Sequence, residues 1–167
     1  MERLLLLTKV IEYLGPIKGE KTLQKLVYLV QKHGQFMGYH FQWFSNGPIN
    51  PEIFSDVKES EFLGLLKINF ENSVPVYEAC YQQLSDSSFW KKQMQSQFLT
   101  EQTLDIIDAL NSENSIHNYN PLFLELLAAL DYDKTTTSQY LSTQNSATTY
   151  PNEYLKSAHD LLHRFYE

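Results

Sequence analysis

The sequence predicts a mixed α+β fold for this chain of 167 residues, which is the length of one compact domain. Three helix-like stretches come first, and two short extended runs follow them, joined by a turn at Asn72-Ser73. Three helices followed by a β-hairpin is the element order of a winged helix. We therefore expect a winged-helix-like N-terminal part over residues 1–82, with an inserted aromatic strand, and a helical C-terminal part over residues 83–167 packed on it.

Of the first two predicted helices, only the second is expected to have a face that could bind a partner. Apolar residues recur at helical spacing over residues 2–14, and Gly15-Pro16 ends this helix. The next helix spans roughly residues 21–33, with one apolar face formed by Leu23, Leu26, Val27 and Val30. The same spacing predicts an opposite, exposed face that carries Lys21, Lys25, Tyr28 and Lys32. With Lys18, this face is expected to form a basic stripe from which Tyr28 points away from the core as a partner anchor. The alternative is that the inserted strand or a C-terminal helix covers Tyr28, which would then belong to a second core.

An aromatic strand and a turn are predicted before the third helix. Aromatic residues alternate over residues 39–44, which is typical of a strand and includes Trp43 and Phe44. Gly47-Pro48 predicts a tight turn into the third helix, for which Asn50 offers a side-chain cap and Pro51 the first position. The apolar pattern fades after Lys58, so a break is expected near residues 59–60.

The second half of the chain is predicted to be helical with polar connections. Helices are expected over residues 85–98, from Thr100 as a cap, from Asn120-Pro121 through a nearly all-apolar stretch at residues 122–130, and from Pro151 onward. Polar loops are expected at residues 111–118 and 134–149.

Composition limits the function classes. The net charge is −7, so the chain on average repels nucleic-acid phosphates, and a DNA-binding role would need a local basic face. The longest apolar run is far shorter than the roughly 20 residues of a membrane span, and no signal-peptide core is present, so we expect no membrane association and a cytoplasmic location. The single cysteine, Cys80, excludes an intrachain disulfide and is interpreted as a structural thiol.

Two spaced motifs resemble a known family. Residues 23–28 read Leu-Gln-Lys-Leu-Val-Tyr and residues 47–54 read Gly-Pro-Ile-Asn-Pro-Glu-Ile-Phe. In this order and separation they resemble the Panacea-type (SocA-like) antitoxin domain, in which a helix K-L-x-K-L-x-Y precedes an aromatic strand ending in G-P-V-x-P-x-x-Y/F. The layout is also similar to that of uncharacterised bacterial YwgA-like proteins. Phe44 stands where the family usually has Trp. The resemblance covers residues 2–82 and implies a module that binds a protein, namely a toxin and in some cases a protease.

No catalytic or metal-binding pattern is present in the sequence. Phosphate-binding glycine loops and the H-E-x-x-H and G-x-S-x-G signatures are absent, so we expect no enzyme and no cofactor. His159 and His163 lie one helical turn apart, but no further ligand accompanies them, and we interpret them as surface residues.

Candidate partner-binding residues are therefore Lys21, Lys25, Tyr28, Lys32, Trp43 and Phe44, while Gly47, Pro48 and Pro51 form the structural motif. The leading hypothesis is a non-enzymatic, antitoxin-like protein-binding module. A DNA-binding transcriptional regulator is the alternative, although the predicted third helix carries more acidic than basic residues. An enzyme of unrecognised chemistry and a homodimer stay open.

Overall fold

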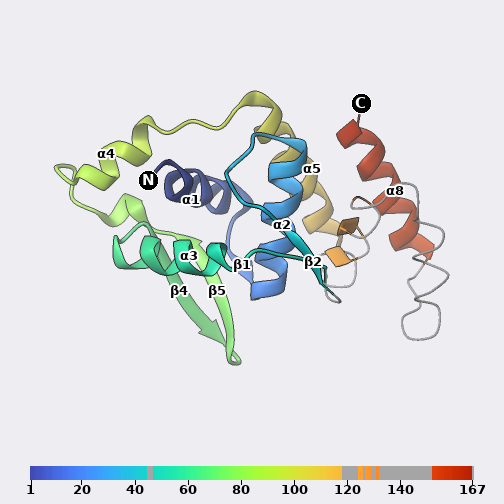
Figure 1. Ribbon diagram of the computed structural model, residues 1–167, viewed down its shortest axis with the longest axis horizontal. Coiled ribbons are helices and arrows are strands. Elements are labelled where there is room, and N and C mark those ends of the chain that lie inside the picture. The colour runs from blue at the N-terminus through green and yellow to red at the C-terminus, as the bar shows by residue number, and fades with distance from the viewer. Residues whose placement is uncertain (45–46, 118–123, 126, 129–130, 132–151, 167) are drawn as a thin grey trace.

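The computed structural model describes residues 1–44, 47–117, 124–125, 127–128, 131 and 152–166. It confirms the mixed α+β class, with helices around two small antiparallel sheets (Figure 1). The helices are α1 (Glu2–Leu14), α2 (Glu20–His33), α3 (Glu52–Phe62), α4 (Phe89–Ser96), α5 (Glu101–His117) and α8 (Asn152–Tyr166), with a 3-10 turn η1 (Tyr81–Gln83). The strands are β1 (Ile17–Lys18), β2 (Gln42–Phe44), β3 (Gly47–Ile49), β4 (Leu66–Glu71) and β5 (Val74–Ala79).

Helix α1 lies at the centre of the molecule. It packs against α2, α3, α4, α5 and β5, so its leucine-rich sequence is buried on almost every side. The main hydrophobic cluster includes residues from α1 through α8 and so contains side chains from both halves of the chain. No helix among the described residues is long and apolar enough to span a bilayer.

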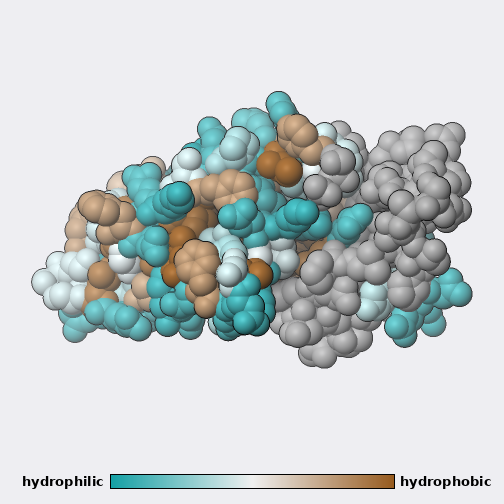
Figure 2. Space-filling model, turned by 90° about the horizontal axis from the view of Figure 1, so that it is seen from below, coloured by the Kyte–Doolittle hydropathy of each residue, from teal (hydrophilic) through white to brown (hydrophobic). Residues whose placement is uncertain are grey.

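The larger sheet has the strand order β1-β5-β4, and both pairings are antiparallel. The predicted β4–β5 hairpin is confirmed, and its turn residues Asn72 and Ser73 both have positive φ, 50° and 66°, as a two-residue hairpin turn requires. The hairpin projects from the body of the protein (Figure 1). Figure 2 shows apolar side chains gathered among polar ones on the face from which it projects. Phe70 of β4 is 70% exposed.

The smaller sheet corrects the expected turn at Gly47-Pro48. Strands β2 and β3 form an antiparallel hairpin in which Phe44 pairs with Gly47, and its connection at residues 45–46 lies outside the described residues. Gly47 and Pro48 are therefore in a strand, and a direct turn into α3 is wrong. The strand expected over residues 39–44 is reduced to β2, because Tyr39 turns inward and is 1% exposed.

Two predicted interruptions are absent from this part of the chain. Helix α3 continues through the expected break to Phe62, because its buried face of Ile53, Asp56, Val57 and Ser60 keeps helical spacing across that point. Helix α5 continues to His117 through most of the expected loop at 111–118. Docking of α5 on α1 and α2 outweighs the low helix propensity of its Asn and Ser residues.

Two helix starts follow the predicted caps, whereas the helix expected over residues 85–98 is the shorter α4, which begins after its cap Ser88. Asn50 Oδ1 accepts a hydrogen bond from the Glu52 N–H at 2.8 Å at the start of α3. Thr100 Oγ1 accepts one from the Thr103 N–H at 3.2 Å at the start of α5. Of the predicted helix at 121–130, the described residues Leu124, Leu127 and Ala128 are buried and helical, whereas the loop expected at 134–149 lies outside the described residues.

Candidate functional site

A small pocket lies where the two motif segments meet. It has a volume of about 210 Å³ and lies between the N-terminal half of α2, strand β3 and the first turn of α3. We call it the α2–β3 pocket, and its lining residues are Glu20, Lys21, Gln24, Lys25, Pro48, Ile49 and Phe54. The segments 23–28 and 47–54, which are apart in the sequence, thus contribute to one surface feature.

Hydrogen bonds of Gln24 hold the two segments together. The buried Gln24 side chain donates to Asn50 O at 2.9 Å and accepts from the Asn50 N–H at 3.0 Å. The Asn50 side chain in turn donates to His40 O at 3.0 Å. Every one of these polar groups is buried or partly buried, so the contacts fix the position of β3 on α2 and give the pocket defined walls.

Lys25 is the unusual residue of this pocket. Its side chain is 4% exposed, and among the described residues none accepts a hydrogen bond from its ammonium group. Burial lowers the pKa of Lys25, the negative charge of Glu125 opposes that shift, and the neighbouring Lys21 adds to it. Gly47 leaves room for the lysine stem, since a Cβ there would lie 3.3 Å from Lys25 Cε.

The predicted basic stripe on α2 is wrong. Lys21 and Lys32 are exposed, but Lys25 and Tyr28 are buried, and Tyr28 is only 7% exposed. Phe41 covers the Tyr28 ring edge-on at 5.4 Å between ring centroids, and Lys32 Nζ donates to the Tyr28 hydroxyl at 3.2 Å. Helix α2 packs on β1, β3 and α5, so it has no continuous exposed face, and Tyr28 cannot be a surface anchor.

The aromatic candidates on β2 are not equivalent. Trp43 is half-buried against the main hydrophobic cluster, whereas Phe44 is 49% exposed. Only Phe44 of this pair is available to a partner as a largely exposed ring. Pro51 is exposed directly before α3, in agreement with its predicted place at the start of that helix.

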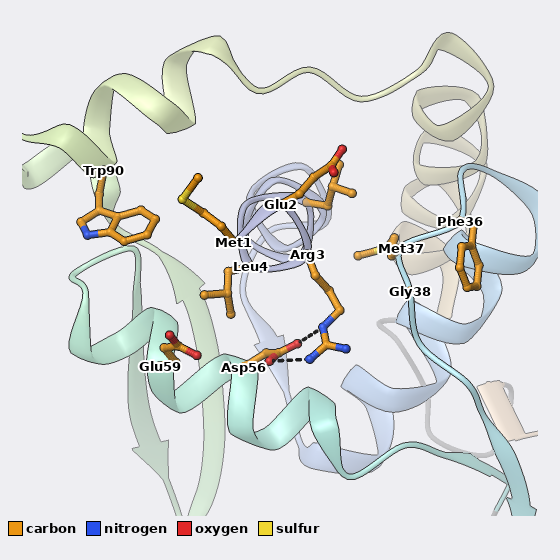
Figure 3. A pocket seen from close by; sticks show the side chains of 11 residues that line it. Met1, Glu2, Arg3, Leu4, Phe36, Met37, Gly38, Asp56, Glu59 and Trp90 are labelled. Atoms are coloured by element: carbon orange, nitrogen blue, oxygen red, sulfur yellow. Dashed lines mark hydrogen bonds and ion pairs between the residues drawn. The ribbon is translucent and has the colours of Figure 1, made fainter.

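A second, larger hollow has a volume of about 570 Å³ and lies beside the start of α1. We call it the α1–α3 hollow, and Figure 3 shows its lining residues Met1, Glu2, Arg3, Leu4, Leu6, Phe36, Met37, Gly38, Asp56, Glu59 and Trp90. Arg3 points from α1 toward α3, where its guanidinium contacts Asp56 at 2.6 and 3.1 Å (Figure 3). A third contact joins Arg3 to Glu52 at 2.9 Å.

The Arg3 guanidinium is already paired with the carboxylates of Asp56 and Glu52. The hydrogen bond to Asp56 raises the pKa of Arg3 more than burial lowers it. The Tyr39 hydroxyl donates to Asp56 Oδ2 at 2.7 Å, and burial followed by this bond raises the pKa of Tyr39 far above its usual range. Since two carboxylates already neutralise the Arg3 guanidinium, it is a structural tie between α1 and α3 and is unsuited to capture an anion.

Sequence reasoning missed a buried ionic cluster between α2 and the C-terminal half. His33 Nε2 lies 2.7 Å from Asp131 Oδ1, and the Tyr166 hydroxyl donates to the same oxygen at 2.7 Å. Lys32 Nζ lies 3.1 Å from Asp131 Oδ2 as an ion pair without a hydrogen bond to that oxygen, and donates to the Asp131 carbonyl at 2.6 Å. The chain distance of 98 residues between His33 and Asp131 gives no pattern that could have predicted this contact.

Neither catalysis nor metal binding has a clear centre in the described part of the chain. Cys80 is half-buried and donates weakly to Gly64 O at 3.5 Å, and burial raises the pKa of its thiol, which disfavours the nucleophilic thiolate. His159 and His163 are exposed, as predicted. Among the described residues there is no group of three or more His, Cys, Asp or Glu side chains placed to hold a metal ion.

Comparisons with models of protein families, with curated proteins and with solved structures found no significant match. The functional assignment therefore depends on the residues of this chain.

Proposed function

We propose that this protein is a non-enzymatic protein-binding module of the antitoxin type, which neutralises or delivers a partner protein. The observation that carries the proposal is the α2–β3 pocket. The two segments that resemble the Panacea-type pattern converge there and contribute Lys25, Pro48 and Phe54 to a single lining.

The surroundings of the pocket suit a protein surface. Lys21 is exposed at its edge, and Phe44 is exposed on β2, the strand that pairs with β3. An exposed aromatic ring provides apolar contact area at low entropic cost, and an exposed lysine steers an acidic partner toward the site. We therefore propose the docking surface to be the pocket together with Lys21 and Phe44.

Affinity capture from the native host tests this proposal. Tagged wild-type protein is compared by mass spectrometry with Lys21→Glu and Ile49→Glu, which alter the pocket, and with Lys92→Glu, which alters an exposed residue on α4. We expect one specific partner with the wild type and with Lys92→Glu, and its loss with both pocket variants. A partner retained equally by all four proteins would place docking elsewhere, and the absence of any specific partner would contradict the proposal.

A DNA-binding regulator is the second candidate, because the element order favours it. Helices α1, α2 and α3 precede the β4–β5 hairpin, and β1 pairs with β5, which is the arrangement expected of a winged helix with β2–β3 inserted. The charges are unfavourable, however. The exposed residues of α3 include Glu52, Glu59 and Glu61 against Lys58, so a helix placed in the major groove would be repelled.

Fluorescence anisotropy with a labelled duplex separates the two candidates. We expect weak binding that falls steeply as salt is raised, and a further loss in Lys21→Glu. Tight binding of a defined sequence at physiological salt would instead favour the regulator.

A further inference from the structure

We infer that the α2–β3 pocket binds a carboxylate attached to an apolar side chain, and that its occupant is the C-terminal residue of a polypeptide. This inference rests on the proposed function in one respect only: the polypeptide that supplies the C-terminal residue is taken to be the partner protein. The chemistry follows from the pocket itself, which combines an apolar wall with an ammonium group for which none of the described residues is a hydrogen-bond acceptor.

The anionic part of the ligand is inferred from Lys25. Its side chain is 96% buried, lines the pocket, and has no hydrogen-bond acceptor among the described residues. The Lys25 ammonium nitrogen is not among the fully buried atoms that lack a hydrogen-bond partner, so it is reached from the pocket. A carboxylate placed there supplies both the opposite charge and hydrogen-bond acceptors. Lys21 precedes Lys25 by one turn of α2, so the two stems lie on the same side of the helix and can share one anion.

The apolar part of the ligand is inferred from the opposite wall. Pro48, Ile49 and Phe54 form it, and the hydrogen bonds between Gln24 and Asn50 hold that wall in place. The volume of about 210 Å³ exceeds the roughly 150 Å³ of a protein cavity that accepts benzene, and is below the range of about 300–1,000 Å³ for drug-sized ligands. It therefore fits one amino-acid side chain, not an extended small molecule.

The ammonium groups of Lys21 and Lys25 favour the C-terminal carboxylate of a polypeptide over a free amino acid. A free amino acid would bring its own ammonium group into a pocket whose lining has Lys21 and Lys25 against the one carboxylate of Glu20, so the charge of the lining is positive on balance and repels that group. The acyl nitrogen of a polypeptide C-terminal residue is neutral and avoids this cost. Glu125 does not remove the need for a ligand, since its charge offsets only part of the effect of burial on Lys25.

The competing cavity is less suited to an anion. The guanidinium of Arg3 in the α1–α3 hollow already contacts Asp56 and Glu52. The side chains that line that hollow have three carboxylates against one cation, whereas those of the α2–β3 pocket have one carboxylate, Glu20, against two cations. Figure 3 shows the Arg3 guanidinium turned toward Asp56.

Peptide titration tests the inference on the full chain. The probes are N-acetylated pentapeptides that end in Leu, Ile, Val or Phe, each prepared with a free carboxylate and with a C-terminal amide, and 4-methylpentanoate as a small acid. Binding is measured by calorimetry, and the backbone amide shifts of residues 20–25 and of the non-proline residues within 47–54 locate the site. We expect at least one free-acid peptide to bind at least tenfold more tightly than its amide.

Matched lysine variants identify the anion contact. Lys25→Met keeps the length of the stem and removes the charge, and we expect at least a tenfold loss of affinity for the free-acid peptide. Lys21→Met changes an exposed residue and should preserve the fold. We expect it to lower the affinity for the free-acid peptide about threefold to tenfold. Lys58→Met, exposed on α3 outside the pocket, should bind as the wild type does.

The other outcomes decide the inference and the proposed function separately. Equal affinity for acid and amide excludes carboxylate recognition, and no binding of any probe excludes the site. Binding of 4-methylpentanoate as tight as that of the best peptide excludes a polypeptide end. If a host partner is captured and Lys25→Met does not weaken it, the proposed function stands and this inference fails. If the peptides bind as expected but no host partner is captured, the inference about the pocket stands and the proposed function fails.

Discussion

Replacing Asp131 by asparagine should lower the free energy of unfolding by about 3–5 kcal/mol at pH 7, the usual cost of breaking a buried ion pair by removing one partner. Asp131 is 1% exposed and lies between α2 and α8. It accepts from the Tyr166 hydroxyl, shares a hydrogen bond with His33, and faces the Lys32 ammonium. Asparagine keeps the shape but not the charge, so the cluster loses its only buried anion among the described groups.

The pH dependence gives this prediction a second signature. Burial alone would raise the pKa of Asp131, but the hydrogen bonds from His33 and Tyr166, with the charges of His33 and Lys32, more than offset it and leave the pKa below its usual range. A carboxyl whose pKa is lower in the folded state stabilises the fold fully above its unfolded pKa, about 3.9, and this contribution is lost as the pH falls through the folded value. The difference between wild type and Asp131→Asn should therefore shrink below about pH 4.

Urea denaturation followed by circular dichroism measures this difference at pH 7 and at steps from pH 4.5 to 3.5. Asp160→Asn, which changes an exposed aspartate on α8, is the matched control and should change stability by less than about 0.5 kcal/mol. A loss under 1 kcal/mol for Asp131→Asn at pH 7, or a gap that stays constant down to pH 3.5, would refute the assigned role of this carboxylate.

Three further substitutions test the fold around the two cavities. Gly47→Ala should destabilise by about 1 kcal/mol or more, because φ is 108° and the added Cβ would lie 3.3 Å from Lys25 Cε; an unchanged urea midpoint would contradict this geometry. Tyr28→Ala should cost about 3–5 kcal/mol in a denaturant melt, as for other buried aromatic residues, and a loss near zero would restore Tyr28 as a surface residue. Arg3→Met should cost about 1–3 kcal/mol, because it leaves the Asp56 carboxylate short of a charged donor. In a double-mutant cycle, Asp56→Asn should then cost less with Met at position 3 than in the wild type, and additive losses would show that the two side chains do not interact.

Elements governed by local pattern were predictable from the sequence. The apolar spacing of α1 and α8, the Thr100 and Asn50 caps, and the Asn72-Ser73 hairpin all depend on residues within one or two turns of each other. A short stretch of sequence contains the whole of such a signal.

Features set by distant contacts were not predictable in this way. The apolar stripe of α2 was identified correctly, but whether its other side meets solvent depends on Phe41 and on Asp131, which binds Lys32. A helical pattern cannot show that a lysine is buried by elements that lie later in the chain. The same holds for the continuation of α5, whose polar residues favour a loop until packing on α1 and α2 is included.

Gly47 connects the fold and the candidate site because it has no side chain. Its positive φ lets β3 begin where the β2–β3 hairpin needs it, and its missing Cβ leaves the space through which the Lys25 stem passes. A larger residue would strain the backbone and press on the Lys25 stem, which would have to shift by a few tenths of an ångström. The spacing between Lys25 and the Gly-Pro pair therefore has a physical reason. The glycine makes room for a buried ammonium, and the adjoining proline supplies part of the apolar wall beside it.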